Sequence, residues 1–205
     1  IGSFPSGLLT GESRVVFDIS GMLKQAVDDR DVDALRYYLE LESGDAATTD
    51  ALDAAAANGF VHALELLLSR GVRPTAGTLW EAARGGHLGA LALLCEHGEP
   101  PDAAACEAAA YAGSLRCLAF LRRIGTPWAE SSCWAAAERG HLEVLEYLHE
   151  NGCPWDERAC DAAVSCGNLR CLEWLIDRDC PRSESLCVVA ARRGHLDCLK
   201  LLSAM

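Results

Sequence analysis

The sequence predicts an all-α solenoid of about seven helix-turn-helix repeats joined by shortened loops. Three observations predict it: a glycine that recurs every 27 residues, a leucine at a fixed place in each copy, and an alanine ahead of each glycine. Self-similarity at a constant period of roughly 20–50 residues is the signature of a repeat architecture. The predicted glycine turns are Gly59, Gly86, Gly113, Gly140, Gly167 and Gly194.

The segment after each glycine has the apolar spacing of an α-helix. We call positions that recur with the repeat one register. One register is leucine in all seven copies, and apolar residues stand three positions before and after it, which places them on one helix face. The leucines are Leu35, Leu64, Leu91, Leu118, Leu145, Leu172 and Leu199.

The segment before each glycine is a second predicted helix. Alanine favours helix, and its small side chain lets another backbone approach closely. The glycine then ends this helix in the left-handed conformation, and a polar residue such as His141 or Asn168 starts the next one. The alanines are Ala26, Ala55, Ala82, Ala109, Ala136, Ala163 and Ala190.

A leucine-rich repeat also has a period near 27 residues, but it requires a short strand rich in β-branched residues. That strand would have to be the stretch from Cys133 to Arg139, which is rich in Ala, Glu and Arg. The helical interpretation is therefore favoured.

The order of residues from Ala136 to Leu142, Ala-Ala-Glu-Arg-Gly-His-Leu, resembles the ankyrin repeat, and the resemblance covers about residues 20–204. The segment between Gly152 and Ala163 is six residues shorter than in the standard 33-residue unit. A Gly-Cys-Pro-Trp-Asp turn stands where that unit has its protruding hairpin. The chain is thus similar to the short ankyrin-like repeats of algae, oomycetes and large DNA viruses.

The two ends differ from the repeats. Residues 1–19 are predicted to form an irregular arm and residues 20–205 the repeat domain, with Ser20 as the N-cap of its first helix. At the other end, the last repeat leads through Leu196 and Leu202 to Met205 without a closing repeat. We expect this end to expose apolar surface, so that either the chain continues or something docks there.

The charge excludes two classes of partner. Thirty acidic and eighteen basic residues give a net charge of −12, which is the wrong sign for nucleic acid or an anionic membrane surface. No apolar run is long enough to span a bilayer, so direct membrane insertion is not expected.

The eleven cysteines predict core thiols more than chemistry. Cysteine alternates with Leu, Val or Ala in the same registers, as a small buried residue does. Cys106, Cys133, Cys160 and Cys187 share one such register. Structural disulfides and metal or redox chemistry remain alternatives, although no Cys-x-x-Cys occurs. The loop cysteines Cys153 and Cys180 are expected to react first.

Free thiols indicate an intracellular, reducing compartment. The cytoplasm is the first choice, and an organelle is the alternative if a targeting peptide was removed. His87, His141 and His195 recur at the turn, where Ser114 and Asn168 substitute, which favours a hydrogen-bonding role in the turn over catalysis. No catalytic motif, metal-binding pattern or cofactor-binding loop occurs. The sequence predicts no enzyme, no cofactor and no metal.

Candidate binding residues are those that vary between copies while their neighbours stay constant. Two first-helix registers vary in this way, and they are predicted to line the inner surface of the stack. Two loop tryptophans follow prolines, where they either pack over the loop or anchor a partner. The predicted partner-binding residues are Trp80, Arg84, Glu107, Tyr111, Trp128, Trp134, Glu138, Trp155, Asp161 and Arg192.

Stacked helix pairs offer a long continuous surface and no deep catalytic pocket. The sequence therefore predicts a non-enzymatic protein-interaction module or scaffold whose partner presents basic or apolar patches. The alternative is a fixed accessory subunit of a large assembly, since the arm and the last repeat both need covering. A thiol redox or metal-binding protein is a third, less favoured hypothesis.

Overall fold

The computed structural model describes residues 18–41, 45–98 and 100–204. These residues form fourteen helices in seven consecutive pairs, and no strand occurs within them. The first helices of the pairs are α1 (Ile19–Asp28), α3 (Asp45–Ala57), α5 (Ala76–Arg84), α7 (Ala103–Tyr111), α9 (Glu130–Arg139), α11 (Glu157–Cys166) and α13 (Leu186–Arg193). The second helices are α2 (Val32–Leu41), α4 (Val61–Ser69), α6 (Leu88–His97), α8 (Leu115–Arg123), α10 (Leu142–Glu150), α12 (Leu169–Asp177) and α14 (Leu196–Ser203).

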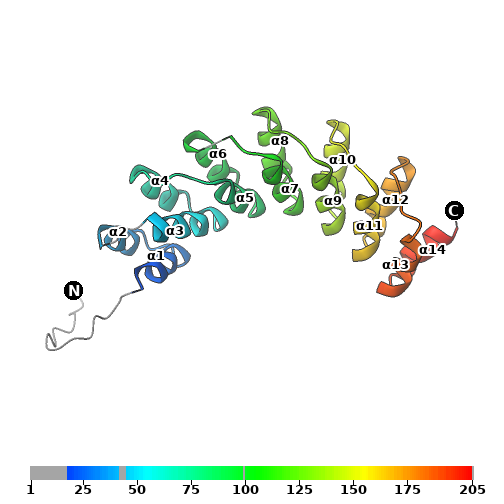
Figure 1. Ribbon diagram of the computed structural model, residues 1–205, viewed down its shortest axis with the longest axis horizontal. Helices are drawn as coiled ribbons and strands as arrows, with labels where there is room; N and C mark the ends of the chain where they lie inside the picture. The colour runs from blue at the N-terminus through cyan, green and yellow to red at the C-terminus, as the bar shows by residue number, and fades with distance from the viewer. Residues whose placement is uncertain (1–17, 42–44, 99, 205) are drawn as a thin grey trace.

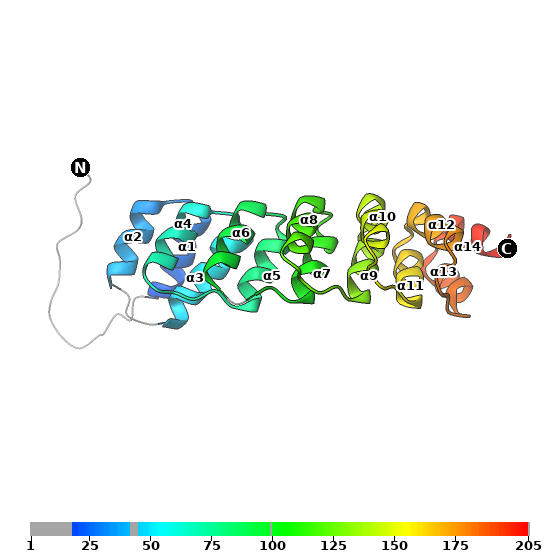
Figure 2. The same cartoon turned by 90° about the horizontal axis from the view of Figure 1, so that it is seen from above.

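The pairs stack side by side into an arch, with the first helices on its concave side and the second helices on its convex side (Figure 1). Seen at right angles, the same pairs form one straight row (Figure 2). Alanines such as Ala82, Ala109 and Ala136 are buried between first helices, whereas leucines such as Leu91 and Leu118 are buried between second helices. Smaller side chains let the first helices approach more closely, so the stack curves toward them. The predicted α-solenoid of about seven repeats is confirmed.

The turn inside each pair has the predicted left-handed residue. Gly140 has a φ of +73°, and the next amide, that of His141, donates to the Ala136 carbonyl at 2.9 Å. This hydrogen bond closes a Schellman turn and satisfies a carbonyl at the helix end. In the first repeat Arg30 takes the left-handed position with a φ of +55°, in place of the glycine used later.

The side chain that follows the glycine reaches back to the preceding repeat. His141 Nε2 lies 3.2 Å from the Tyr111 carbonyl oxygen, and Asn168 Nδ2 donates to the carbonyls of Ala137 and Glu138, at 2.8 Å each. A carbonyl only accepts, so the histidine donates from Nε2–H. The predicted turn role of these residues is confirmed, and the turn that they bond belongs to the neighbouring repeat.

A second left-handed residue follows several of the second helices and allows the loop to be short. Gly152 has a φ of +78°, and the amide of Cys153 donates to the Leu148 carbonyl at 2.9 Å. Asp179 takes the same position one repeat later, with a φ of +55°. A proline and the next first helix follow within a few residues.

The first helix begins slightly earlier than predicted. Its N-cap is Asp18, whose side chain accepts from the Gly21 amide at 3.0 Å, and the predicted N-cap Ser20 lies inside α1. The carboxylate is a better acceptor at this position than a hydroxyl. Residues 1–17 of the predicted arm lie outside the described residues, so the division of the chain at residue 19 stays a prediction.

Candidate interaction surface

The concave side of the arch carries two registers of first-helix side chains that differ from repeat to repeat. We call them the concave strip, which consists of Trp80, Glu107, Trp134, Asp161 and Val188 in one register and Arg84, Tyr111, Glu138, Ser165 and Arg192 in the other. The two registers are four residues apart, so their members are neighbours on one helix face. Most are half-buried beside alanines that are fully buried. Repeat packing fixes the alanines and leaves the strip free to vary.

The strip is hollowed where three first helices meet. A groove of about 440 Å³ is lined by Trp134 and Glu138 of α9, Asp161 of α11 and Arg193 of α13. Arg158, at the start of α11, lines it as well. The fold thus brings together three of the predicted binding residues, Trp134, Glu138 and Asp161, from two successive repeats. A ring, two carboxylates and two guanidinium groups give this groove the chemistry to bind a charged side chain of a partner.

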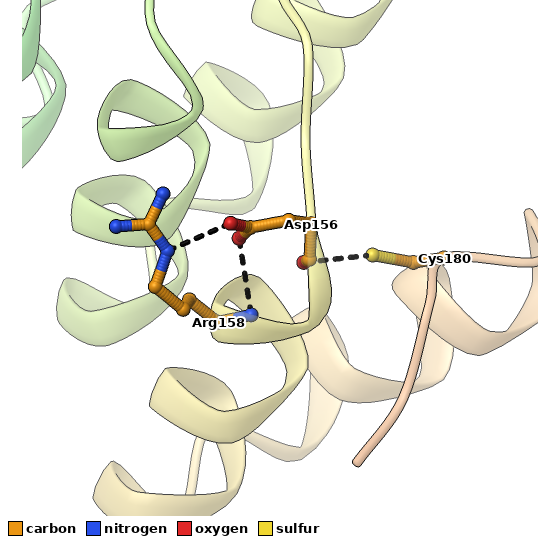
Figure 3. Close-up of polar contacts among 3 residues, drawn as sticks. All are labelled: Asp156, Arg158 and Cys180. Atoms are coloured by element: carbon orange, nitrogen blue, oxygen red, sulfur yellow. Dashed lines mark hydrogen bonds and ion pairs between the residues drawn. The ribbon is translucent and has the colours of Figure 1, made fainter.

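Arg158 is fixed at the edge of this groove by the cap of its own helix (Figure 3). One Asp156 oxygen accepts from the Arg158 amide at 3.1 Å, and the other lies 2.7 Å from Arg158 Nε. The hydrogen bond to Asp156 raises the pKa of Arg158, and the charges of Glu130 and Glu107 act in the same direction. The Cys180 thiol donates to the Asp156 carbonyl at 3.5 Å, which ties the cap to the loop of the next repeat.

Two other aromatic rings of the concave strip already hold a cation of this chain. The guanidinium of Arg84 lies 5.3 Å from the centre of the Trp80 ring, and that of Arg139 lies 4.8 Å from the Tyr111 ring. Arg84 also lies 3.6 Å from a Glu81 oxygen. Cation–π contacts of this kind stabilise exposed pairs by about 0.5–1 kcal/mol.

The N-terminal part of the concave side is acidic. A hollow of about 640 Å³ lies along α1, α3 and α5. Its charged lining residues are Asp18, Lys24, Asp28, Asp50, Asp53 and Glu81. Five carboxylates and one ammonium make this end of the concave side attractive to basic groups.

The loop tryptophans do not join the concave strip. Trp155 stacks on His149 at a centroid distance of 4.0 Å and meets Trp174 of α12 edge-on at 5.8 Å. Trp128 lies 6.3 Å from the Tyr147 ring of α10, and the guanidinium of Arg122 lies 5.2 Å from the centre of the Trp128 ring. Both indoles therefore pack against second helices, and both cover the junction to the next repeat.

Several residues that share the groove are not among the binding residues predicted from the sequence. Arg158, Cys166 and Arg193 line it, yet none was a candidate. The signal was present in the sequence, because two further first-helix registers vary. One contains Asp50, Gly77, Ala104, Ser131 and Arg158, and the other contains Asn58, Gly85, Ala112, Arg139, Cys166 and Arg193.

The cysteines confirm the core prediction in most positions, contradict it at Cys187, and contradict the expected reactivity of the two loop cysteines. Cys106, Cys117, Cys133, Cys160, Cys171 and Cys198 are buried, and all eleven thiols are free. Cys153 and Cys180, expected to react first, are only 5% and 3% exposed, because their thiols donate to loop carbonyls. Cys187, expected in the core, is exposed, since no described helix packs on the far side of α13.

Burial raises the pKa of several of these thiols. It raises the pKa of Cys106 to about 12 and that of Cys171 to about 11. The pKa of Cys180 is also raised, first by its hydrogen bond with Cys160 and then by burial. Buried neutral thiols are poor nucleophiles. Among the described residues, no group of three or more His, Cys, Asp or Glu side chains is placed to hold a metal ion.

None of the helices described for this chain combines the length and the apolar character needed to cross a membrane.

Comparison with known proteins agrees with this fold. Residues 133–176 match a family model described as ankyrin repeats in many copies. The crystal structure of the human ASB11 ankyrin repeat domain matches with a TM-score of 0.60 and 24% identity, over 75% of this chain and 82% of that one. No curated protein matches the chain. The similarity to short algal, oomycete and viral repeats stays a prediction, whereas the family match over residues 133–176 and the similar solved structure show that the chain has the ankyrin-repeat fold.

Proposed function

We propose that the chain is a non-enzymatic protein-interaction scaffold that binds a protein partner through the concave strip and the loop tryptophans. Ankyrin repeats generally mediate protein–protein interaction. The observation that carries the proposal is the contrast on the first helices. Fully buried alanines such as Ala109 and Ala136 repeat unchanged, while half-buried neighbours such as Tyr111 and Glu138 differ in charge and size from repeat to repeat.

The partner presents basic or apolar patches to this surface. The acidic hollow along α1, α3 and α5 and the net charge of −12 both support a basic patch. The half-buried rings of Trp134 and Tyr111 support apolar contacts. Aromatic side chains of this kind often dominate the energy of protein interfaces.

The absence of catalysis is part of the proposal, because the residues that would perform it have structural roles. His87, His141 and His195 are bonded to backbone carbonyls of the preceding repeats. Eight of the eleven thiols are buried. The free thiols also support an intracellular, reducing compartment as the place of action.

Affinity purification of the full-length protein from its source, followed by cross-link mapping, tests the proposal. We expect cross-links on the concave strip and near the loop tryptophans. A strip variant, Tyr111→Ala with Trp134→Ala, is expected to lose the partner. A convex-face control, Arg116→Ala with Glu173→Ala, is expected to keep it. Cross-links confined to the second helices, with the partner retained by the strip variant, contradict the proposal.

A fixed accessory subunit of a larger assembly is the second candidate, and the last repeat favours it. Leu196 is 64% exposed and Val188 56% exposed, whereas their counterparts in the preceding repeat, Leu169 and Asp161, are half-buried. Exposed apolar surface of this kind marks an interaction site. Size-exclusion chromatography of the isolated chain separates the candidates. A transient scaffold elutes as a monomer, whereas a subunit without its assembly self-associates.

A further inference from the structure

Trp134 differs from the other tryptophans in having an unoccupied ring. Trp80, Trp128 and Trp174 each have an arginine within 5.3 Å of the ring centre, and Trp155 is stacked on His149. Within the described residues, Trp134 alone among the five tryptophans has neither a cation nor an aromatic ring against it. Yet it lines a groove that is open to a partner.

The chain itself shows what a tryptophan in this register binds. Trp80 stands two repeats earlier in the same register, and the residue four positions later is Arg84, whose guanidinium covers the ring. Four positions after Trp134 the residue is Glu138. The internal cation is therefore replaced by a carboxylate, which cannot cover the ring but can help to hold a cation that comes from outside.

A second carboxylate lies in the same groove. Asp161 belongs to the register of Trp134 one repeat later, and one of its oxygens accepts from the Ser183 hydroxyl at 2.7 Å. Among the described residues, neither Glu138 nor Asp161 forms an ion pair with Arg158 or Arg193, the cations of the groove. Arg158 pairs instead with Asp156. The two carboxylates therefore keep acceptor capacity for another cation.

We propose that Trp134, Glu138 and Asp161 form a subsite for an arginine or lysine side chain of the partner protein, which rests on the function proposed above. The cation lies over the indole ring and donates to the two carboxylates. Both contacts are stronger in a partly desolvated groove than on an open surface. The subsite deepens the proposed function by naming the chemistry that the partner must present at α9 and α11.

Indole N–H signals from nuclear magnetic resonance test the subsite directly. The probes are blocked tripeptides with a central arginine, lysine, norleucine or glutamate between two glycines. The Trp134 signal is identified by its loss in Trp134→Leu. We expect it to shift with the arginine and lysine peptides and to stay in place with norleucine. A shift with the glutamate peptide, or none with arginine up to its solubility limit, overturns the proposal.

Charge variants give matched controls in one chain. Glu138→Gln is expected to weaken binding of the arginine peptide at Trp134 by roughly two- to fivefold, the loss expected for one exposed ion pair. Glu138→Arg is expected to abolish the response, because the new side chain covers the ring as Arg84 covers Trp80. Trp80→Leu leaves the Trp134 response unchanged. An unchanged response in Glu138→Arg, with the fold intact by circular dichroism, contradicts the subsite.

A carboxylate introduced beside Trp80 tests, by gain of function, whether the residue four positions after the tryptophan decides what the ring binds. Arg84→Glu uncovers the Trp80 ring, and we expect its indole signal to begin responding to the arginine peptide. No response there overturns the argument from the repeat. The proposed function is judged separately: a partner held by the concave strip but indifferent to Glu138→Arg leaves the scaffold standing and removes the subsite.

Discussion

The imidazole of His195 lies against the turn of the preceding repeat, with its Nε2 3.1 Å from the carbonyl oxygen of Ser165. A Cβ atom added at Gly167, the left-handed residue of that turn, would lie 2.5 Å from His195 Nδ1. The glycine is therefore required both for its backbone conformation and for the space that the ring fills. The same relationship joins His141 to Gly113 and makes these turns part of the junctions between repeats.

Replacement of the His141 ring is expected to destabilise the junction between its repeat and the preceding one. His141→Ala removes the bond to the Tyr111 carbonyl and should lower the free energy of unfolding by about 1–2 kcal/mol. His141→Asn should recover most of the loss, because Asn168 bonds the same kind of turn one repeat later. Guanidinium denaturation followed by circular dichroism measures both. Equal losses in the two variants contradict the junction role.

The turn glycines should differ in their tolerance of a side chain. Gly140→Ala and Gly194→Ala both place alanine in the left-handed region, at a cost of about 1–2 kcal/mol. Gly140→Ala also brings Cβ to 2.9 Å from Asn168 Oδ1, whereas nothing lies within 4 Å at Gly194. We expect Gly140→Ala to cost about 1–2 kcal/mol more, since it displaces a bonded side chain. Equal denaturation midpoints would show that the contact with Asn168 is unimportant.

Thiol labelling should follow exposure. Cys166 and Cys187 are exposed and are expected to react within the mixing time of a maleimide or disulfide reagent. Cys153 and Cys180 should stay unlabelled until the chain unfolds, since they are buried and bonded to carbonyls. Peptide mapping by mass spectrometry assigns the sites. Rapid labelling of either loop cysteine in the folded protein contradicts the packing of the loops.

Alkaline pH is expected to weaken the fold through buried thiols. The pKa of Cys171 is raised by burial from 9.0 to about 11, so the folded chain binds this proton more tightly than the unfolded chain. The stabilisation of the folded chain by this bound proton is complete below pH 9 and is lost as the pH rises from 9 to about 11. Other repeats already have alanine in this register, at Ala63 and Ala90. Cys171→Ala should therefore reduce the pH dependence of the free energy of unfolding between pH 9 and about 11. The exposed Cys166→Ala serves as the control and should leave it unchanged.

Sequence reasoning worked where a position does the same job in every repeat. The alanines of the first helices and the glycines of the turns have one environment each, so their recurrence predicted both burial and backbone conformation. It failed at Cys187, because the register predicts a covered position and α13 has a described neighbour on one side only. It failed at Cys153 because loop membership was taken as exposure, whereas the short loop folds its thiol inward.

By itself, the sequence determined the period, the helical class, the acidic character and the positions that vary, since these depend on local spacing and composition. Tertiary structure decided which variable side chains meet. Trp80 and Trp134 are equivalent in the sequence, but one ring is covered by Arg84 and the other faces Glu138, Asp161 and an open groove. The exchange of Arg84 for Glu138 can be read four residues along one helix, but only the packing of α11 against α9 brings Asp161, which lies 27 residues after Trp134 in the chain, into the same groove.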